Sequence, residues 1–324
     1  MITRVIAQML MAFTVLRVVP VDAANLEWQL GIPTTPNALA APLLSLTSTR
    51  ITLPMVGERI LPPKKTDLSS YGVVTDAQSV FVADTASGAA LFAKNTDDVR
   101  PIGSITKLMT ALFFLDTNPD LASWVKIIDD DYVGGGRVNL NFGDGITLRN
   151  VLGASVVGSD NTATQSLARF SGLSYEDFIA AMNAKAKSLG MASSSFTEVT
   201  GIDSGNVSTA HDLMLLLAEA KKQDILVRFM TTQRLPISHA SGLAVTVEST
   251  DMLFNSILDS GEYEITGGKT GYIPEAGYCF ITTVNHDGDE IFVAVLGASS
   301  SLDRFADTKA LSMWAFSTFT WPNL

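Results

Sequence analysis

The stretch that decides the fold runs from residue 103 to residue 109 and reads Gly103-Ser104-Ile105-Thr106-Lys107-Leu108-Met109. Pro101 and Gly103 precede apolar periodicity over residues 104 to 116, which predicts a helix that begins at Ser104. Residues three apart lie one above the other on a helix, so the Ser104 hydroxyl can meet the Lys107 amine. Free backbone N–H groups at the helix start favour a developing oxyanion. The pattern predicts a serine nucleophile with a lysine base.

A histidine base is disfavoured. The chain has only three histidines, His211, His239 and His286, and none lies beside a nucleophile signature. We expect each of them to be a solvated or capping residue. So few histidines also argue against a His-ligated metal, and a single cysteine, Cys279, allows neither an intrachain disulfide nor a cysteine-ligated zinc site. We therefore expect no metal and no cofactor, and Cys279 reads as a buried strand residue.

The Ser-x-x-Lys pattern is weak by itself, because it recurs at residues 123 to 126. It gains weight from two further motifs. Ser159-Asp160-Asn161 lies between two apolar helical patterns, where an interhelical loop would present polar side chains to a cleft. Lys269-Thr270-Gly271 ends a predicted strand. In this order the three motifs are the signature of penicillin-binding proteins and class A beta-lactamases.

Several other segments imitate functional motifs. Ser204-Gly205-Asn206 also fits Ser-x-Asn but lacks flanking apolar helices, so we prefer Ser159. Lys269-Thr270 imitates a phosphate-binding loop, yet position 263 is tyrosine where that motif needs glycine. Residues 134 to 136, three glycines, predict a flexible loop beside the cleft, and residues 129 to 131, three aspartates, predict a solvated acidic turn.

The periodicities predict an α+β fold. Two apolar runs around a glycine turn, 79 to 84 and 89 to 94, indicate an opening hairpin. Apolar helical periodicity marks the middle of the chain, and strands return near its end, before a closing helix at 301 to 318. We expect one antiparallel sheet built from both ends, flanked by helices and carrying an inserted all-helical lobe. The predicted helices are 104–116, 147–157, 162–170, 175–188 and 209–221, and the late strands are 263–270, 278–284 and 290–296.

Composition and the N-terminus bear on location. The 324 residues are 47% hydrophobic and carry a net charge of -11, so a nucleic-acid partner is not expected. Residues 1–23 resemble a signal peptide, although an uncleaved anchor is the alternative; after cleavage we expect no stable transmembrane anchor and a secreted, periplasmic or cell-wall location. Residues 24–75, with six of the twelve prolines, predict a Pro/Ser/Thr-rich tether, and 76–324 the folded domain.

Longer segments carry a family resemblance. Residues 99–111, 181–191 and 206–210 resemble the low-molecular-mass penicillin-binding proteins, which are serine D-alanyl-D-alanine carboxypeptidases and endopeptidases. They look closest to the endopeptidase branch, the type of penicillin-binding protein seven. The resemblance covers about residues 76 to 318. It implies a DD-peptidase/beta-lactamase-like fold, the peptidoglycan stem peptide as substrate, beta-lactams as inhibitors, and a role in cell-wall biogenesis and cell shape.

The resemblance also implies roles for single residues. Ser104 attacks the carbonyl between two D-centres and forms an acyl-enzyme, while a neutral Lys107 takes its proton; the Lys269 cation and partial burial would lower the Lys107 pKa. Ser159 relays a proton to the leaving amine, and Asn161 holds the substrate amide and orients Lys107. Lys269 and Thr270 bind the substrate carboxylate, and Gly271 lets the peptide approach the strand. The backbone N–H groups of Ser104 and Tyr272 form the oxyanion hole.

Some features depart from the family pattern. Asp160 stands where many carboxypeptidases have glycine, which brings a beta-lactamase forward unless Asp160 faces away from the site; Glu176 and Glu198 lack the context of a deacylating glutamate. A catalytically silent cell-wall binding protein is the other alternative. The chain ends without the extra β domain of many carboxypeptidases, so we expect a soluble or loosely attached protein. Carboxypeptidase and endopeptidase action stay equally open.

Overall fold

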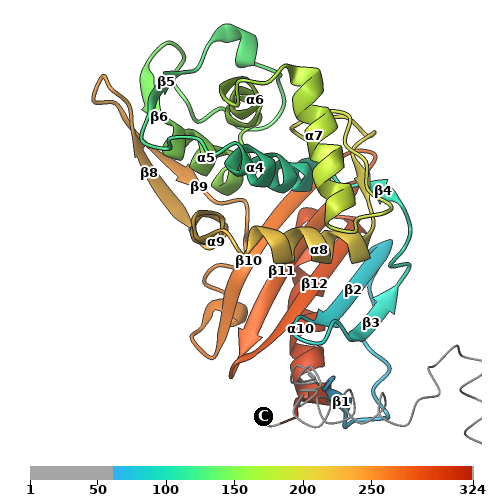
Figure 1. Cartoon of the computed structure of the whole chain (residues 1–324). Coiled ribbons are helices and arrows are strands. Elements are labelled where there is room, and N and C mark those ends of the chain that lie inside the picture. Colours follow the sequence, from blue (N-terminus) through green and yellow to red (C-terminus); the bar gives the residue numbers. More distant parts are fainter. Residues whose placement is uncertain (1–60, 323–324) are drawn as a thin grey trace, which may run out of the picture. The chain divides into compact units, whose positions relative to one another are not determined.

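A five-stranded antiparallel sheet is the framework of the computed structural model, which describes residues 61–322 (Figure 1). Its strand order is β10-β11-β12-β2-β3, so strands from both ends of the described chain share one sheet. The α+β prediction is therefore confirmed. The strands are β2 (Ser79–Asp84), β3 (Ala90–Lys94), β10 (Tyr263–Ile273), β11 (Gly277–His286) and β12 (Asp289–Ala298).

Each face of the sheet packs on a helix. Successive strand residues point to opposite faces, and accordingly Val80 and Val82 belong to one buried cluster while Phe81 and Ala83 belong to the other. The closing helix α10 (Ser301–Thr318) supplies Phe305 and other apolar side chains to the first cluster. Helix α8 (Ala210–Ala220) packs against the opposite face (Figure 1). Burial on both faces fixes the register of the strands.

The chain between β3 and β10 builds the predicted helical lobe (Figure 1). Its central helix, α4 (Thr106–Asp116), is buried on nearly all sides, and a 3-10 turn, η1 (Gly103–Ile105), precedes it. Side-chain caps begin the helices around it, since Thr147, Asp160 and Ser174 each accept a backbone N–H. Those helices are α5 (Leu148–Val157), α6 (Asn161–Phe170) and α7 (Tyr175–Ser188).

Shorter elements complete the described chain, and the sequence did not reveal most of them. It did not predict helix α9 (Asp224–Met230) or the hairpin of β8 (Arg234–Ser238) with β9 (Ala244–Glu248), whose short patterns alternate only partly. The others are β1 (Lys64–Lys65), β4 (Arg100–Pro101), β5 (Trp124–Lys126), η2 (Asp129–Asp131), β6 (Gly145–Thr147), β7 (Val207–Ser208), η3 (Ile257–Asp259) and β13 (Phe319–Thr320).

Several residues between 64 and 75, which the sequence predicts as part of the tether, contact the folded domain. Strand β1 pairs with β13, and the backbone N–H of Thr66 donates to the Thr318 carbonyl. Trp314 Nε1 donates to Ser70 Oγ, and Lys94 Nζ donates to the Thr75 carbonyl. A two-residue strand carries no periodic signal, which is why the sequence hid this pairing. The predicted signal peptide and the tether up to residue 60 lie outside the described residues.

Two predictions about polar residues are wrong. The side chain of His239 is fully buried, not solvated, and neither ring nitrogen has a hydrogen-bond partner. Asp131 in the predicted acidic turn is also buried and accepts two hydrogen bonds from the Arg169 guanidinium. In contrast, Cys279 is buried in β11 as expected. No helix within residues 61–322 has the length and apolar character needed to cross a membrane.

The aromatic residues near the C-terminus are partly buried and pack against one another. The Trp314 ring meets Phe92 and Phe319 edge-on, at centroid distances of 5.7 and 5.6 Å. Phe316 lies 5.5 Å from Trp321. These contacts tie the closing helix to the sheet.

Candidate active site

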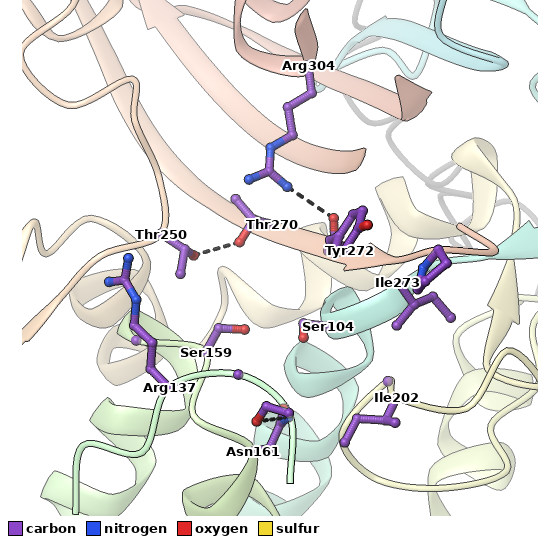
Figure 2. Close-up of a pocket in the computed structure, with 16 residues that line it drawn as sticks. Ser104, Arg137, Ser159, Asn161, Ile202, Thr250, Thr270, Tyr272, Ile273 and Arg304 are labelled. Atoms are coloured by element: carbon purple, nitrogen blue, oxygen red, sulfur yellow. Dashed lines mark hydrogen bonds between the residues drawn. The ribbon is translucent and has the colours of Figure 1, made fainter. Parts of the chain in front are cut away.

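The three sequence motifs meet at one cavity of about 420 Å³ (Figure 2). Ser104 comes from the turn before α4, Ser159 and Asn161 from the junction of α5 and α6, and Thr270 to Tyr272 from the edge strand β10. Lys107 and Lys269 are buried and reach the two serines by hydrogen bonds. The structure thus brings together all eight residues that the sequence analysis singled out: Ser104, Lys107, Ser159, Asn161, Lys269, Thr270, Gly271 and Tyr272.

Ser104 and Lys107 are in direct contact. Lys107 Nζ lies 2.8 Å from Ser104 Oγ and also donates to the Thr200 carbonyl at 2.5 Å. The 3-10 turn places the serine at the start of α4, and the lysine follows in the first turn of the helix. The expected hydroxyl–amine pair is therefore present, and Thr200 is a partner of Lys107 that the sequence analysis did not find.

Burial lowers the pKa of Lys107 to about 7, because an ammonium group loses its hydration in the fully buried site. The carboxylates of Glu198 and Asp160 oppose this by favouring the charged form. Burial likewise lowers the pKa of Lys269 well below its ordinary value, and repulsion from Lys107 adds to the effect. Of the two expected causes of the lowered Lys107 pKa, burial is the leading one, and the other influences come from Glu198 and Asp160 rather than from Lys269.

Ser159 joins the second motif to the third. Its Oγ accepts a hydrogen bond of 2.9 Å from Lys269 Nζ, which also donates to the Thr270 carbonyl. Ser159 has a φ of 57°, in the left-handed region that costs a non-glycine residue about 1–3 kcal/mol. Such strain persists where the surroundings fix the backbone, and here it directs the hydroxyl into the cleft (Figure 2).

The side chain of Asn161 turns toward the glycine loop. Its Nδ2 donates to the carbonyls of Gly134 and Gly135, at 3.0 and 2.7 Å. The structure shows no hydrogen bond between Asn161 and Lys107, so the expected orientation of the lysine by Asn161 is absent; the Thr200 carbonyl occupies that position instead. The glycine loop borders the cleft as predicted, because Gly135 and Gly136 line it.

Asp160 faces away from the cavity and organises the neighbouring backbone. Its carboxylate caps α6 by accepting from the Ala163 N–H, and it also accepts from the Asn139 N–H at 2.6 Å. Asp160 is buried and does not line the cavity. The departure from the family pattern at this position therefore has a structural explanation.

Thr250 and Arg304 extend the third motif and were missed by the sequence analysis. Thr250 Oγ1 lies 2.6 Å from Thr270 Oγ1, and the Arg304 guanidinium donates to the Gly271 and Cys279 carbonyls. Both residues line the cavity (Figure 2). Neither belongs to a recognisable short motif, since Thr250 follows a hairpin and Arg304 lies in the first turns of α10.

Gly271 allows a close contact between two backbone segments. A Cβ at this position would lie 2.2 Å from the Ile102 carbonyl oxygen, so the glycine lets β10 pack against the turn before α4. Gly103 meets the same strand, because its Cβ would lie 2.6 Å from the backbone nitrogen of Tyr272. The backbone at Ser104 and that at Tyr272 are thereby held close together, and the Tyr272 ring stacks on Tyr278.

The imitating motifs lie outside this arrangement. Lys126 is in strand β5, so the second Ser-x-x-Lys segment does not have the helical spacing that the chemistry needs. Asn206 is buried and uses its amide oxygen to accept from the Thr197 and Glu198 N–H groups. Within residues 61–322, no group of three or more His, Cys, Asp or Glu side chains is arranged to hold a metal ion.

Comparison with known proteins gives the family. Residues 67–300 match the family model described as D-alanyl-D-alanine carboxypeptidase. The chain belongs to this family. A D-alanyl-D-alanine endopeptidase of Pseudomonas aeruginosa is 31% identical over 78% of this chain and 81% of its own length. The corresponding endopeptidase of Escherichia coli is 34% identical over 73% of this chain and 76% of its own.

Solved structures of the family agree with the fold. A Streptomyces DD-transpeptidase is similar with a TM-score of 0.70 and 27% identity, over 76% of this chain and 100% of that one. A penicillin-binding protein of Listeria monocytogenes, in its cefotaxime-bound form, gives a TM-score of 0.66 and 29% identity over the same shares. The DD-peptidase/beta-lactamase-like fold implied by the sequence resemblance is therefore confirmed.

Proposed function

We propose that this protein is a serine DD-peptidase that cleaves D-alanyl bonds of peptidoglycan stem peptides through an acyl-enzyme on Ser104. The hydrogen bond between Ser104 and a fully buried Lys107 carries the proposal. A lysine with a pKa of about 7 is uncharged in a large share of molecules at neutral pH and can accept the serine proton. The family and the printed names of its relatives supply the class of substrate.

Acylation uses the start of α4. The uncharged Lys107 amine takes the Ser104 proton, and Ser104 Oγ attacks the D-alanyl carbonyl carbon. The oxyanion that forms would accept hydrogen bonds from the backbone N–H groups of Ser104 and Tyr272, which the close packing of Gly103 on β10 holds together. These donors are fixed before the substrate arrives, so little reorganisation is needed in the transition state.

The third motif anchors the substrate. The substrate carboxylate would bind the Thr250 and Thr270 hydroxyls, in the field of Lys269 and Arg304. Ser159 would pass a proton to the leaving amine, since its hydroxyl lies in the cleft and contacts Lys269. Water then attacks the acyl-enzyme and releases the acyl peptide. Gly271 keeps β10 against the turn before α4, so that the peptide can lie along this edge strand.

The two alternatives fit the site less well. A class A beta-lactamase needs a glutamate that activates the deacylating water, but the Glu198 carboxylate already accepts hydrogen bonds from Thr200, Gly201 and Asn206. Glu176 lies in the first turn of α7 and does not line the cavity. A catalytically silent binding protein would have no need for a buried lysine held against a serine.

We further propose that the protein acts after export, in the periplasmic or cell-wall space, and that it takes part in cell-wall biogenesis and cell shape.

A labelled penicillin tests the proposal. We expect it to modify the wild-type protein covalently at Ser104, as located by mass spectrometry of the digested protein. Ser104→Ala should abolish labelling, whereas the control Ser123→Ala, in the second Ser-x-x-Lys segment, should be labelled at the wild-type rate. A folded wild-type protein that takes up no label, or one labelled elsewhere, contradicts the assignment of the nucleophile. Release of D-alanine or cleavage of cross-links from muropeptides by the wild type, and not by Ser104→Ala, checks the peptidase activity.

A further inference from the structure

Arg137 is a cation in the cleft that the mechanism does not use. It is exposed, follows the three glycines of residues 134 to 136, and lines the same cavity as Ser104. The structure shows no hydrogen bond or ion pair for its guanidinium within residues 61–322. Lys269 and Arg304, in contrast, donate to protein oxygens. Arg137 therefore remains available to a ligand.

The second motif holds the loop that carries Arg137 on both sides. Asn161 Nδ2 binds the carbonyls of Gly134 and Gly135 before it, and the Asp160 carboxylate accepts from the Asn139 N–H after it. Asp160 and Asn161 are themselves buried. A Cβ at Gly136 would lie 3.2 Å from Asn161 Nδ2, so the glycine allows this close approach. The backbone on both sides of Arg137 is thus held by the motif that also supplies Ser159.

The two ends of the cleft, on either side of Ser104, are lined by different residues. Figure 2 shows Ser104 in the middle, Tyr272 and Ile273 on one side, and Thr250 with the Arg137 guanidinium on the other. If the substrate carboxylate binds Thr250 and Thr270, the leaving group lies on that side of Ser104 and the acyl part lies along β10 on the Tyr272 side. A leaving D-alanine ends at its carboxylate on these threonines. A larger leaving group continues past them, toward Arg137.

We propose that Arg137 is a substrate-binding residue that recognises a second carboxylate on the leaving group. The preferred substrate would then be a peptide cross-link, whose leaving amine belongs to a further acidic peptide, rather than a terminal D-alanine. This inference rests on the proposed function and deepens it. A guanidinium forms paired, charge-assisted hydrogen bonds with a carboxylate, and the leaving group of a terminal D-alanine offers only the one carboxylate that the threonines bind.

Substrates that differ in the charge of the leaving group test whether Arg137 binds a second carboxylate. Three synthetic substrates share one acyl-D-alanyl part and end in D-glutamate, its neutral isostere D-glutamine, or D-alanine. We expect the wild type to cleave the D-glutamate substrate with about tenfold higher kcat/KM than the D-glutamine substrate, the range for one partly exposed charged hydrogen bond. Arg137→Gln should abolish this preference and leave kcat/KM for the D-glutamine and D-alanine substrates unchanged. High salt should reduce the wild-type preference.

Two controls separate the inference from the proposed function. Arg149→Gln removes an exposed arginine of α5 that does not line the cavity, and it should keep the preference. Penicillin labelling of Ser104 should proceed at the same rate in the wild type and both variants. On natural muropeptides, Arg137→Gln should lower cleavage of cross-linked dimers relative to removal of terminal D-alanine.

Equal cleavage of the D-glutamate and D-glutamine substrates by the wild type would overturn the role of Arg137, with normal penicillin labelling showing that the proposed function stands. An unchanged preference in Arg137→Gln would overturn it as well. Loss of both peptide cleavage and penicillin labelling in the wild type would instead refute the proposed function, and the inference with it.

Discussion

At the scale of single residues, the central feature is an amine that the fold keeps from being fully charged. Lys107 is completely buried, and its amine donates to the Ser104 hydroxyl and the Thr200 carbonyl. Burial penalises the ammonium form, and the two nearby carboxylates, Glu198 and Asp160, only partly restore it. The balance of these effects brings the pKa close to neutrality, where a general base works best.

The rate of Ser104 acylation should therefore depend on pH through Lys107. The reactive form is the uncharged amine, and its population rises as the pH increases through about 7. We expect the second-order rate of penicillin labelling to increase about tenfold per pH unit below this value and to level off above it. Stopped-flow or quenched labelling between pH 5 and 9 measures the profile. A rate that is flat across this range would argue against Lys107 as the base.

Glu198 is expected to act as a positioning residue for Lys107. Its carboxylate accepts from Thr200 N and Oγ1 and from Gly201 N, and so fixes the turn whose Thr200 carbonyl meets Lys107 Nζ. Glu198→Gln should slow acylation and also move the midpoint of its pH profile downward, because the carboxylate raises the Lys107 pKa.

The midpoint distinguishes this role from a purely structural one. Asp203→Asn is the matched control, since Asp203 lies in the same loop and its side chain accepts from the Gly205 N–H rather than from Thr200 or Gly201. It should leave the midpoint in place. A Glu198→Gln protein that is slower but has an unchanged midpoint would show that Glu198 does not act on the Lys107 charge.

At the scale of elements, the cleft depends on how closely the edge strand β10 approaches the turn before α4. Gly271 and Gly103 remove the side chains that would keep the two apart, and Gly201 does the same on the other side, where a Cβ would lie 2.0 Å from the Gly103 carbonyl oxygen. Three glycines from separate segments thus allow three backbones to meet around Ser104. The oxyanion donors depend on this contact.

Gly271→Ala should therefore disturb both stability and acylation. The new methyl group would clash with the Ile102 carbonyl, and overpacking of this kind costs about 1–3 kcal/mol. Gly267→Ala, on the same strand, is the control, because the nearest atoms to its Cβ are side-chain atoms, at 3.3 Å or more, and none is backbone. Urea unfolding and penicillin labelling measure the two effects. If Gly271→Ala behaved like Gly267→Ala, the strand contact would not be what sets the site.

At the scale of the whole folded domain, strands from the early and the late part of the described chain share one sheet. Strands β2 and β3 extend a sheet begun by β10 to β12, and residues 64 to 75 continue onto the closing helix and β13. The backbone of Thr66, the Ser70 hydroxyl and the Thr75 carbonyl all bind partners in the domain. This segment therefore contributes to the stability of the sheet that carries β10.

A comparison of two shortened proteins tests that contribution. A protein that starts at residue 76 lacks the β1–β13 pairing and the contacts of Ser70 and Thr75, whereas one that starts at residue 61 keeps them. We expect the shorter protein to be less stable by roughly 2–4 kcal/mol, from lost hydrogen bonds and lost apolar burial of the segment. Chemical denaturation gives the difference in unfolding free energy. Equal stability would show that the folded domain begins at residue 76, as the sequence analysis expected.

Local sequence patterns were enough to predict the main elements and the chemistry that short spacings encode. Helical and strand periodicity located the main helices and all five strands of the central sheet within a few residues, because these elements are amphipathic or wholly apolar. The spacing of Ser104 and Lys107 gave the nucleophile and its base, since three residues correspond to one helical turn.

The distant groups that surround Ser104 and Lys107 follow from the tertiary fold and not from local sequence. Thr200, Thr250 and Arg304 reach the cleft from segments without any motif, and Asn161 contacts the glycine loop instead of Lys107. The burial that lowers the Lys107 pKa likewise comes from packing of the helical lobe against the sheet. Such contacts join residues far apart in the chain, and local patterns carry no information about them.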